Sequence, residues 1–328
     1  MNLNYVCFYV CRGIYEFADD CEQIMLAADH VTVRLLGFEA YASALDNFLA
    51  GGKQDPSSLS KSKAIKRNSY LAPYQRSAII GVEVNFPLGS IDRAEISGPD
   101  GIDYSKLPHK KIAVAAFRSV AAALALTRSG RASSELDFIV DGFYAEDKAK
   151  NFHQRLIENS IFDGPAMTRV SDGEIEDAAK LSLRLHEENR FKTIVTLLSD
   201  AQTPYLHGRL CSFVAAWSGL EVLVNKKFTE LESNLREIIA KSGLHEVLSG
   251  RILSVMSGKY RILDKFIVLA ASFNLPEIES DIAEFKKIKD DRDKFFHSMK
   301  IDIDDLPLEE ARDMLEKYLR LSLGSATS

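Results

Sequence analysis

From Pro204 to its end, the chain has almost no strand signal and carries long stretches in which apolar residues recur every three or four positions. That spacing places apolar side chains along one face of a helix. Helices are expected over 205–232 with a continuation over 235–248, over 260–273, from after Pro276 to about 297, and from 304 or 305 through 319. Helices with short connections and one apolar stripe each pack as an antiparallel bundle. The sequence therefore predicts an all-α antiparallel helical bundle over 204–328.

The first 200 residues give a mixed pattern. Strands are expected over 5–10, 31–35, 78–86 and 93–97, and helices over 13–29, 41–49, 110–127, 147–159 and 173–188. The apolar segments 136–140 and 191–198 fit either a helix or a strand. Because a chain of 328 residues commonly forms about two domains, we expect an α+β region over 1–200 ahead of the bundle. Its role is open, and a sensor or specificity domain is our hypothesis.

The charge balance argues against a protein that coats nucleic acid. Lys and Arg number 41 against 47 Asp and Glu, which gives a formal net charge of -6. A local basic site stays open. No phosphate-binding loop, G-x-S-x-G elbow or H-E-x-x-H spacing is present, so neither a metal nor a cofactor is expected.

Cysteine usage and hydropathy indicate the compartment. The four cysteines include no C-x-x-C pair and are too few for a disulfide framework in so long a chain. We expect reduced, mostly buried thiols. No apolar run approaches the roughly 18 residues of a membrane span, and the N-terminus lacks the order of a signal peptide. These features predict a cytoplasmic protein without membrane contact.

One pair near the end of the third expected helix has the chemistry to act on a phosphodiester. Arg292 offers a charged, planar fork of donors that suits a phosphate. His297 can take and give a proton, since free histidine has a pKa of about 6.5. Five positions on a straight helix differ by about 140°. The two side chains therefore meet only where the helix ends or bends, or across a two-fold axis. Alternatively, Arg292 pairs with one of the neighbouring carboxylates, Asp290, Asp291 or Asp293.

The surroundings of this pair resemble a known family. HEPN domains carry an Arg-polar-x-x-x-His motif, which here is Arg292-Asp293-Lys294-Phe295-Phe296-His297. The motif closes the penultimate expected helix, and a polar linker and an amphipathic helix follow. Upstream, the segment 213–223, with Trp217 ahead of Leu220 and Glu221, is similar to the first helix of Apea-like HEPN domains. The resemblance covers about 204–323, and residues 1–200 resemble no family that we can name.

The resemblance implies a metal-independent endoribonuclease, a hydrolase that works as a homodimer without a cofactor. In that scheme His297 acts as general base on a ribose 2′-hydroxyl, or as general acid on the leaving 5′-oxygen. Arg292 binds the scissile phosphate and stabilises its charge in the transition state. The supporting residues are Asp293, which orients His297 or holds the helix end, Lys294, which contacts phosphate, and Glu221, which faces the site. The resemblance also implies anti-phage defence or toxin function, with a protein or phage-derived trigger.

Two alternatives stay open. HEPN bundles also serve as non-catalytic modules that bind nucleic acid, nucleotide or a protein partner, and Glu221 fits a solvated helix surface equally well. The polar stretch 53–76 mixes cations with tyrosines, a composition that suits phosphate contact and base stacking in single-stranded RNA. A solvated loop fits the same composition. The candidate RNA-binding residues in this stretch are Lys61, Lys63, Lys66, Arg67 and Tyr70.

Overall fold

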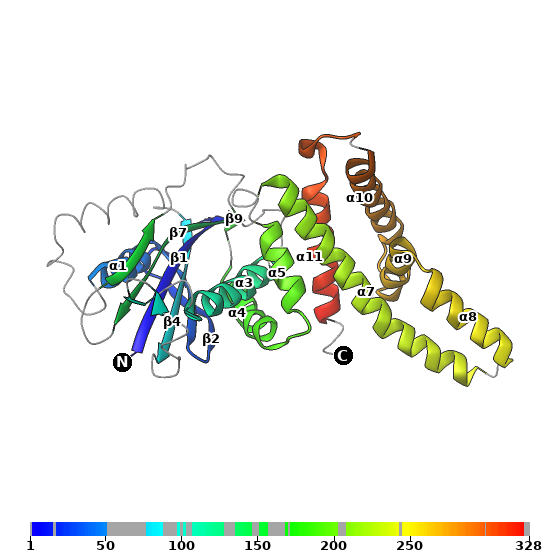
Figure 1. The fold of residues 1–328 in the computed structure, drawn as a ribbon, viewed down its shortest axis with the longest axis horizontal. Coiled ribbons are helices and arrows are strands. Elements are labelled where there is room, and N and C mark those ends of the chain that lie inside the picture. Colours follow the sequence, from blue (N-terminus) through cyan, green and yellow to red (C-terminus); the bar gives the residue numbers. More distant parts are fainter. Residues whose placement is uncertain are drawn as a thin grey trace. The chain divides into compact units, whose positions relative to one another are not determined.

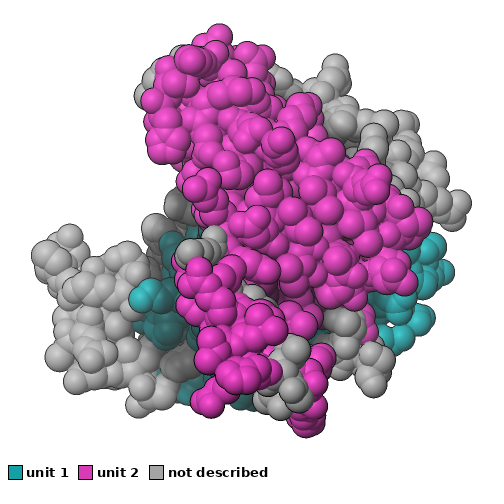
Figure 2. Space-filling model, turned by 90° about the vertical axis from the view of Figure 1, so that its right-hand side faces the viewer, with its two compact units in different colours: residues 1–202 teal, residues 203–328 magenta. Residues whose placement is uncertain are grey.

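The chain forms two compact units, Met1–Gln202 and Thr203–Ser328, which Figure 2 colours separately. The computed structural model describes residues 2–15, 18–50, 77–87, 97–98, 101–102, 107–127, 135–145, 151–156, 168–169, 171–202, 208–242, 245–298 and 300–324. An antiparallel sheet with helices in the first unit and a mostly helical second unit confirm the expected order of an α+β region followed by helices.

The first unit is built on a sheet with the strand order β2-β3-β4-β1-β7-β8. Figure 1 labels four of these strands, β1, β2, β4 and β7. The central strand β1 pairs antiparallel with β4 and β7, and the short β9 runs parallel to its end. The strands are β1 (Asn2–Tyr15), β2 (Glu22–Ala28), β3 (Val31–Leu36), β4 (Ser77–Pro87), β7 (Glu135–Ala145), β8 (Asn151–Leu156) and β9 (Thr168–Arg169). A separate two-residue ladder joins β5 (Ser97–Gly98) to β6 (Gly101–Ile102).

Helices cover both faces of this sheet. Successive side chains of β1 point to opposite faces, so each face presents aromatic side chains that a helix can bury. Phe8 packs under α1, where its ring centroid lies 5.3 Å from that of Tyr41. Tyr9 points the other way and stacks on Phe117 of α3, with 3.8 Å between ring centroids. The helices of this unit are α1 (Phe38–Ala50), α3 (His109–Thr127), α4 (Asp172–Glu187) and α5 (Lys192–Ala201).

A buried polar cluster lies on the α3 side of the sheet. The Tyr5 hydroxyl donates to the Asp141 carboxylate at 2.7 Å, and the Lys110 amine lies 3.4 Å from the same oxygen. Burial raises the pKa of Tyr5 well above its usual range, so the phenol remains a neutral donor. Burial also raises the pKa of Cys7 to about 12, which leaves an unreactive thiol. Cys11 is likewise buried, whereas Cys211 is exposed.

In the second unit each main helix contributes one large aromatic ring to a shared core. Phe266 stacks on Phe285 with 4.0 Å between ring centroids, and Tyr318 lies 4.9 Å from Phe266. Trp217 reaches Phe285 from α7 at 5.4 Å. The elements are α7 (Arg209–Lys241), α8 (Glu246–Lys259), α9 (Ile262–Ser272), α10 (Ile278–Ser298), the 3-10 turn η5 (Ile303–Asp305) and α11 (Leu308–Gly324). Aromatic contacts therefore join α7, α9, α10 and α11.

The prediction of a helix is wrong for two segments of the first unit, 13–29 and 147–159. The segment 13–29 contains the end of β1 and the strand β2, which pairs with β3. A register shift between Ile24 and Leu26 leaves both Met25 and Leu26 buried. The apolar residues there therefore do not alternate as in a regular strand, and their spacing resembles that of a helix. Within 147–159, residues Asn151–Leu156 form β8 against β7. In both cases, hydrogen bonding to a neighbouring strand overrides local periodicity.

The bounds of several other elements differ from those predicted from the sequence. Of the strand expected over 93–97, only Ser97 lies within the described residues, in the ladder β5–β6. The segment 136–140 is part of β7, and 191–198 falls mainly in α5. The first bundle helix does not break near residue 232, because α7 runs on to Lys241. The ion pair between Arg236 and Glu232, four residues apart, spans the expected break and supports the helix there. A second such pair, Lys241–Glu237, lies in the last turns of α7. In the described parts of the chain, no helix combines the length and the apolar character needed to cross a membrane.

Candidate functional site

The helix α10 carries both residues of the predicted catalytic pair. It runs unbroken from Ile278 to Ser298, so Arg292 and His297 differ in direction by about 140°. The Ser298 hydroxyl donates to the Lys294 carbonyl at 2.7 Å, which completes the last turn. Within the described residues, no hydrogen bond joins Arg292 to His297. The helix thus neither bends nor ends between the two residues, and one chain does not bring them together.

The Arg292 guanidinium is fixed by three neighbours. Its Nη1 donates to an oxygen of Asp293 at 2.8 Å. Its central carbon lies 5.8 Å from the ring centroid of Trp217, which is buried, and 5.7 Å from that of Phe296, which is 44% exposed. The Arg292 side chain is itself 33% exposed. A cation so placed is held in one orientation and still reaches solvent.

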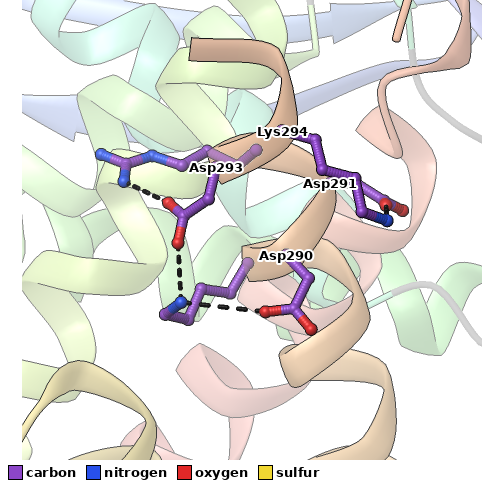
Figure 3. Close-up of polar contacts among 6 residues, drawn as sticks. Asp290, Asp291, Asp293 and Lys294 are labelled. Carbon is purple, nitrogen blue, oxygen red and sulfur yellow. Dashed lines mark hydrogen bonds and ion pairs between the residues drawn. The ribbon is translucent and has the colours of Figure 1, made fainter. Parts of the chain in front are cut away.

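Asp293 bridges two cations, as Figure 3 shows. One carboxylate oxygen accepts from Arg292, and the other accepts from Lys289 at 2.7 Å. Partial burial opposes ionisation of Asp293, but the two hydrogen bonds outweigh it and hold its pKa below the usual range. The carboxylate therefore orients Arg292. Asp293 was also expected to orient His297, as one of two roles. It makes no contact with His297 among the described residues.

The remaining charges of this turn also balance one another. Lys294 is exposed and lies 2.8 Å from Asp291, whose hydrogen bond raises the pKa of the amine. Lys289 lies 3.8 Å from Asp290 (Figure 3). Asp290, Asp291 and Asp293 thus face Lys289, Arg292 and Lys294, and the turn carries no net excess of negative charge.

The other predicted site residues lie in different surroundings. His297 is exposed in the last turn of α10. Glu221 is half-buried on α7, four residues after Trp217, and so lies on the same side of α7 as the ring that Arg292 contacts. The predicted RNA-binding residues Lys61, Lys63, Lys66, Arg67 and Tyr70 lie outside the described residues.

Two contacts of this group were not predicted, Lys289 with Asp293 and Phe296 with Arg292, although the sequence contains a signal for both. Lys289 precedes Asp293 by four residues, and Phe296 follows Arg292 by four. Residues at that spacing meet on a helix surface. The Trp217 contact has no such signal, because it depends on how α7 packs beside α10.

The helix α10 offers an oriented guanidinium with paired carboxylates and, pointing in another direction, an exposed imidazole. Such a group can bind a phosphate and move a proton, which are the two requirements of ribose-assisted cleavage. In the described ranges, no three His, Cys, Asp or Glu side chains are placed to hold a metal ion. No family model, curated protein or solved structure matches the chain.

Proposed function

We propose that the second unit is a metal-independent endoribonuclease of the HEPN type, with Arg292 and His297 as catalytic residues. The observation that supports it best is the placement of Arg292, which is held by Asp293 and two aromatic rings while a third of its side chain faces solvent. A guanidinium that is already oriented loses little side-chain freedom when it binds a phosphate. The resemblance of the motif supplies the class of reaction.

The proposed reaction uses the ribose of the substrate as nucleophile. His297 accepts the proton of the 2′-hydroxyl, the 2′-oxygen attacks phosphorus, and the bond to the 5′-oxygen breaks as that oxygen gains a proton. Arg292 stabilises the charge on the phosphoryl oxygens. The products are a 2′,3′-cyclic phosphate and a 5′-hydroxyl. Because the two side chains diverge on α10, the site takes Arg292 from one copy of the chain and His297 from a second.

Labelled RNA in EDTA tests this proposal. Wild-type protein should cleave it, and Arg292→Ala and His297→Ala should each lose activity by roughly 100-fold or more. Arg292→Lys should lose activity too, because an amine keeps the charge but not the planar fork. Lys286→Ala is the matched control, an exposed cation of the same helix. Cleavage that EDTA abolishes, or that both alanine variants retain, contradicts the proposal.

A non-catalytic module is the second candidate, and the Arg292–Asp293 ion pair favours it. In that case the arginine serves to close the turn, and the bundle binds nucleic acid, nucleotide or a protein partner without cutting RNA. RNA that stays intact at every protein concentration while binding persists supports this candidate.

The proposed setting follows from the same resemblance. The enzyme acts in the cytoplasm on cellular or invader RNA, as in anti-phage defence or a toxin system. The first unit serves as sensor or specificity domain for a protein or phage-derived trigger. A trigger requirement has its own signature in the RNA assay, because cleavage then begins only after lysate from infected cells is added.

A further inference from the structure

A pocket of about 580 Å³ lies within the first unit. Its described lining comes from α3, α4 and α5, which pack together; Figure 1 shows these helices. Among the described residues, the charged side chains that line it are all cations, namely Lys110, Lys111 and Arg118 from α3 and Lys192 from α5. Pockets of roughly 300–1,000 Å³ hold small organic ligands and cofactors. The size of the pocket thus suits a molecule, and its charge suits an anion.

Three of the four cations come from the first half of α3. Lys110, Val114 and Arg118 follow one another at intervals of four residues, so they line about 12 Å of the helix. Lys111 stands beside this row, one turn before Ala115. The pocket therefore presents positive charge along its length, with short apolar side chains between the charges.

Two of the four cations are already paired with carboxylates. Lys110 lies 3.4 Å from Asp141, and Arg118 lies 2.7 Å from Asp200. These ion pairs hold the two side chains in place. Lys111 and Lys192 are exposed, and no described carboxylate forms an ion pair with either. Two positive charges at the pocket are thus unbalanced, which matches the charge of a phosphate dianion.

The rest of the lining suits an organic group attached to that anion. Val114, Leu185 and Val195 supply apolar surface, and Ser119 and Thr196 supply hydroxyls. The Ser119 hydroxyl donates to the Ala115 carbonyl at 3.1 Å and keeps its acceptor sites. A ligand with both a phosphate and a flat apolar part uses both kinds of surface.

We propose that this pocket binds a phosphorylated small molecule of nucleotide size, whose phosphate is held by Lys111 and Lys192. The inference does not depend on the ribonuclease, because it concerns side chains of the first unit alone. It gives that unit a definite task, the recognition of a soluble phosphorylated ligand.

His186 of α4 provides an internal probe, because it lines the same pocket. Burial lowers the pKa of its imidazole, the neighbouring Glu187 carboxylate opposes that shift, and the Lys192 amine adds to it. The three cations of α3, Lys110, Lys111 and Arg118, also line the pocket. A bound phosphate brings negative charge, which favours the imidazolium. Binding should therefore raise the pKa of His186, as followed by NMR of its ring protons.

Calorimetric titration of the full-length protein tests the proposal, with inorganic phosphate, pyrophosphate, ADP and adenosine as probes. Saturable binding of ADP and pyrophosphate is expected, with weaker binding of phosphate and none of adenosine. The double variant Lys111→Gln, Lys192→Gln should raise the Kd by about tenfold or more, since it removes two charge-assisted contacts. Lys180→Gln is the control, an exposed lysine of α4 that does not line the pocket.

Three results overturn the inference. The first is no saturable binding of phosphate, pyrophosphate or ADP at millimolar concentration. The second is an unchanged Kd in the double variant. The third is binding of an RNA oligomer that the double variant weakens while no small probe binds, because this result assigns the cations to a nucleic-acid surface. None of these measurements involves RNA cleavage, so their outcome is separate from that of the ribonuclease.

Discussion

The Arg292 guanidinium contacts a carboxylate and two aromatic rings, so any phosphate must compete with Asp293 for it. About a third of each partner of this ion pair is exposed. Pairs at that exposure contribute at most about 1 kcal/mol. The scissile phosphodiester carries one negative charge, as a carboxylate does, but it binds a guanidinium through two oxygens and gains a second negative charge in the transition state. The existing pair therefore orients the arginine without preventing its use.

A second arginine pair gives a pH-dependent prediction. Arg209 donates to both oxygens of Glu309, at 3.0 and 2.9 Å. Partial burial opposes ionisation, but these bonds outweigh it and lower the pKa of Glu309 below its usual range. A lowered folded-state pKa stabilises the fold above the unfolded value of about 4.5, and this contribution is lost as pH falls through the folded value. Glu309→Gln should thus lower the free energy of unfolding at pH 7 by at most about 1 kcal/mol, and the difference should shrink as pH falls through the folded-state pKa of Glu309.

Urea unfolding followed by Trp217 fluorescence measures this difference. Trp217 is the only tryptophan and is buried in the second unit, so its signal reports on that unit. Glu279→Gln, an exposed glutamate of α10, is the matched control. A difference between Glu309→Gln and wild type that stays constant as the pH is lowered into the acid range would show that packing, and not charge, is responsible.

Between elements, a buried carboxylate joins α10 to α11. Asp281 is 6% exposed and accepts hydrogen bonds from the Tyr318 hydroxyl at 2.7 Å and the Lys317 amine at 2.8 Å. Burial raises the pKa of Tyr318 above its usual range, so its hydroxyl remains a donor. Removing the shared acceptor leaves two donors without it, whereas removing one donor leaves the other bond intact.

We therefore expect unequal costs from the two ends of this contact. Asp281→Ala should lower the free energy of unfolding of the second unit by about 2–3 kcal/mol, and Tyr318→Phe by about 1 kcal/mol. The measurement is again urea unfolding followed by Trp217 fluorescence. Equal costs for the two variants would mean that Asp281 is not the shared acceptor that holds the two helices together.

Whether an element could be predicted from the sequence depends on how far along the chain its stabilising partners lie. Helices such as α3 and α4 were predicted nearly to the residue, because their apolar spacing is local. The structure adds a second local feature to α4, a capping box of Ser171 and Glu174. The strands β2 and β8 were read as helices, because their hydrogen bonds go to β3 and β7. Their stability lies in cross-strand pairing, which local periodicity does not record.

At the candidate site, too, local contacts could be predicted from the sequence and distant ones could not. Arg292 and His297 come from a short motif, and Lys289 and Phe296 follow from four-residue spacing on one helix. Trp217 lies 75 positions before Arg292, and the Arg118–Asp200 pair spans 82 positions. Contacts over such separations arise only from packing, so the sequence predicts candidate side chains but not the groups that hold them.

At the scale of the whole molecule, the divergence of Arg292 and His297 on α10 makes the number of chains in the assembly part of the proposed mechanism. A site within one chain cannot use both side chains on a straight helix. A pair of chains related by a two-fold axis can, because each copy then supplies one member of two equivalent sites. Either arrangement leaves the single variants inactive, so only their mixture separates the two.

Mixing Arg292→Ala protein with His297→Ala protein should restore activity. In a mixed dimer one site loses both residues, and the other keeps an intact arginine from one chain and an intact histidine from the other. Random exchange makes half of the dimers mixed, each with one working site, so about a quarter of wild-type activity is expected. Mixing Arg292→Ala with the double variant Arg292→Ala, His297→Ala is the control, since no intact site can form. If the first mixture stays as inactive as the control while subunit exchange is verified, the site does not span two chains.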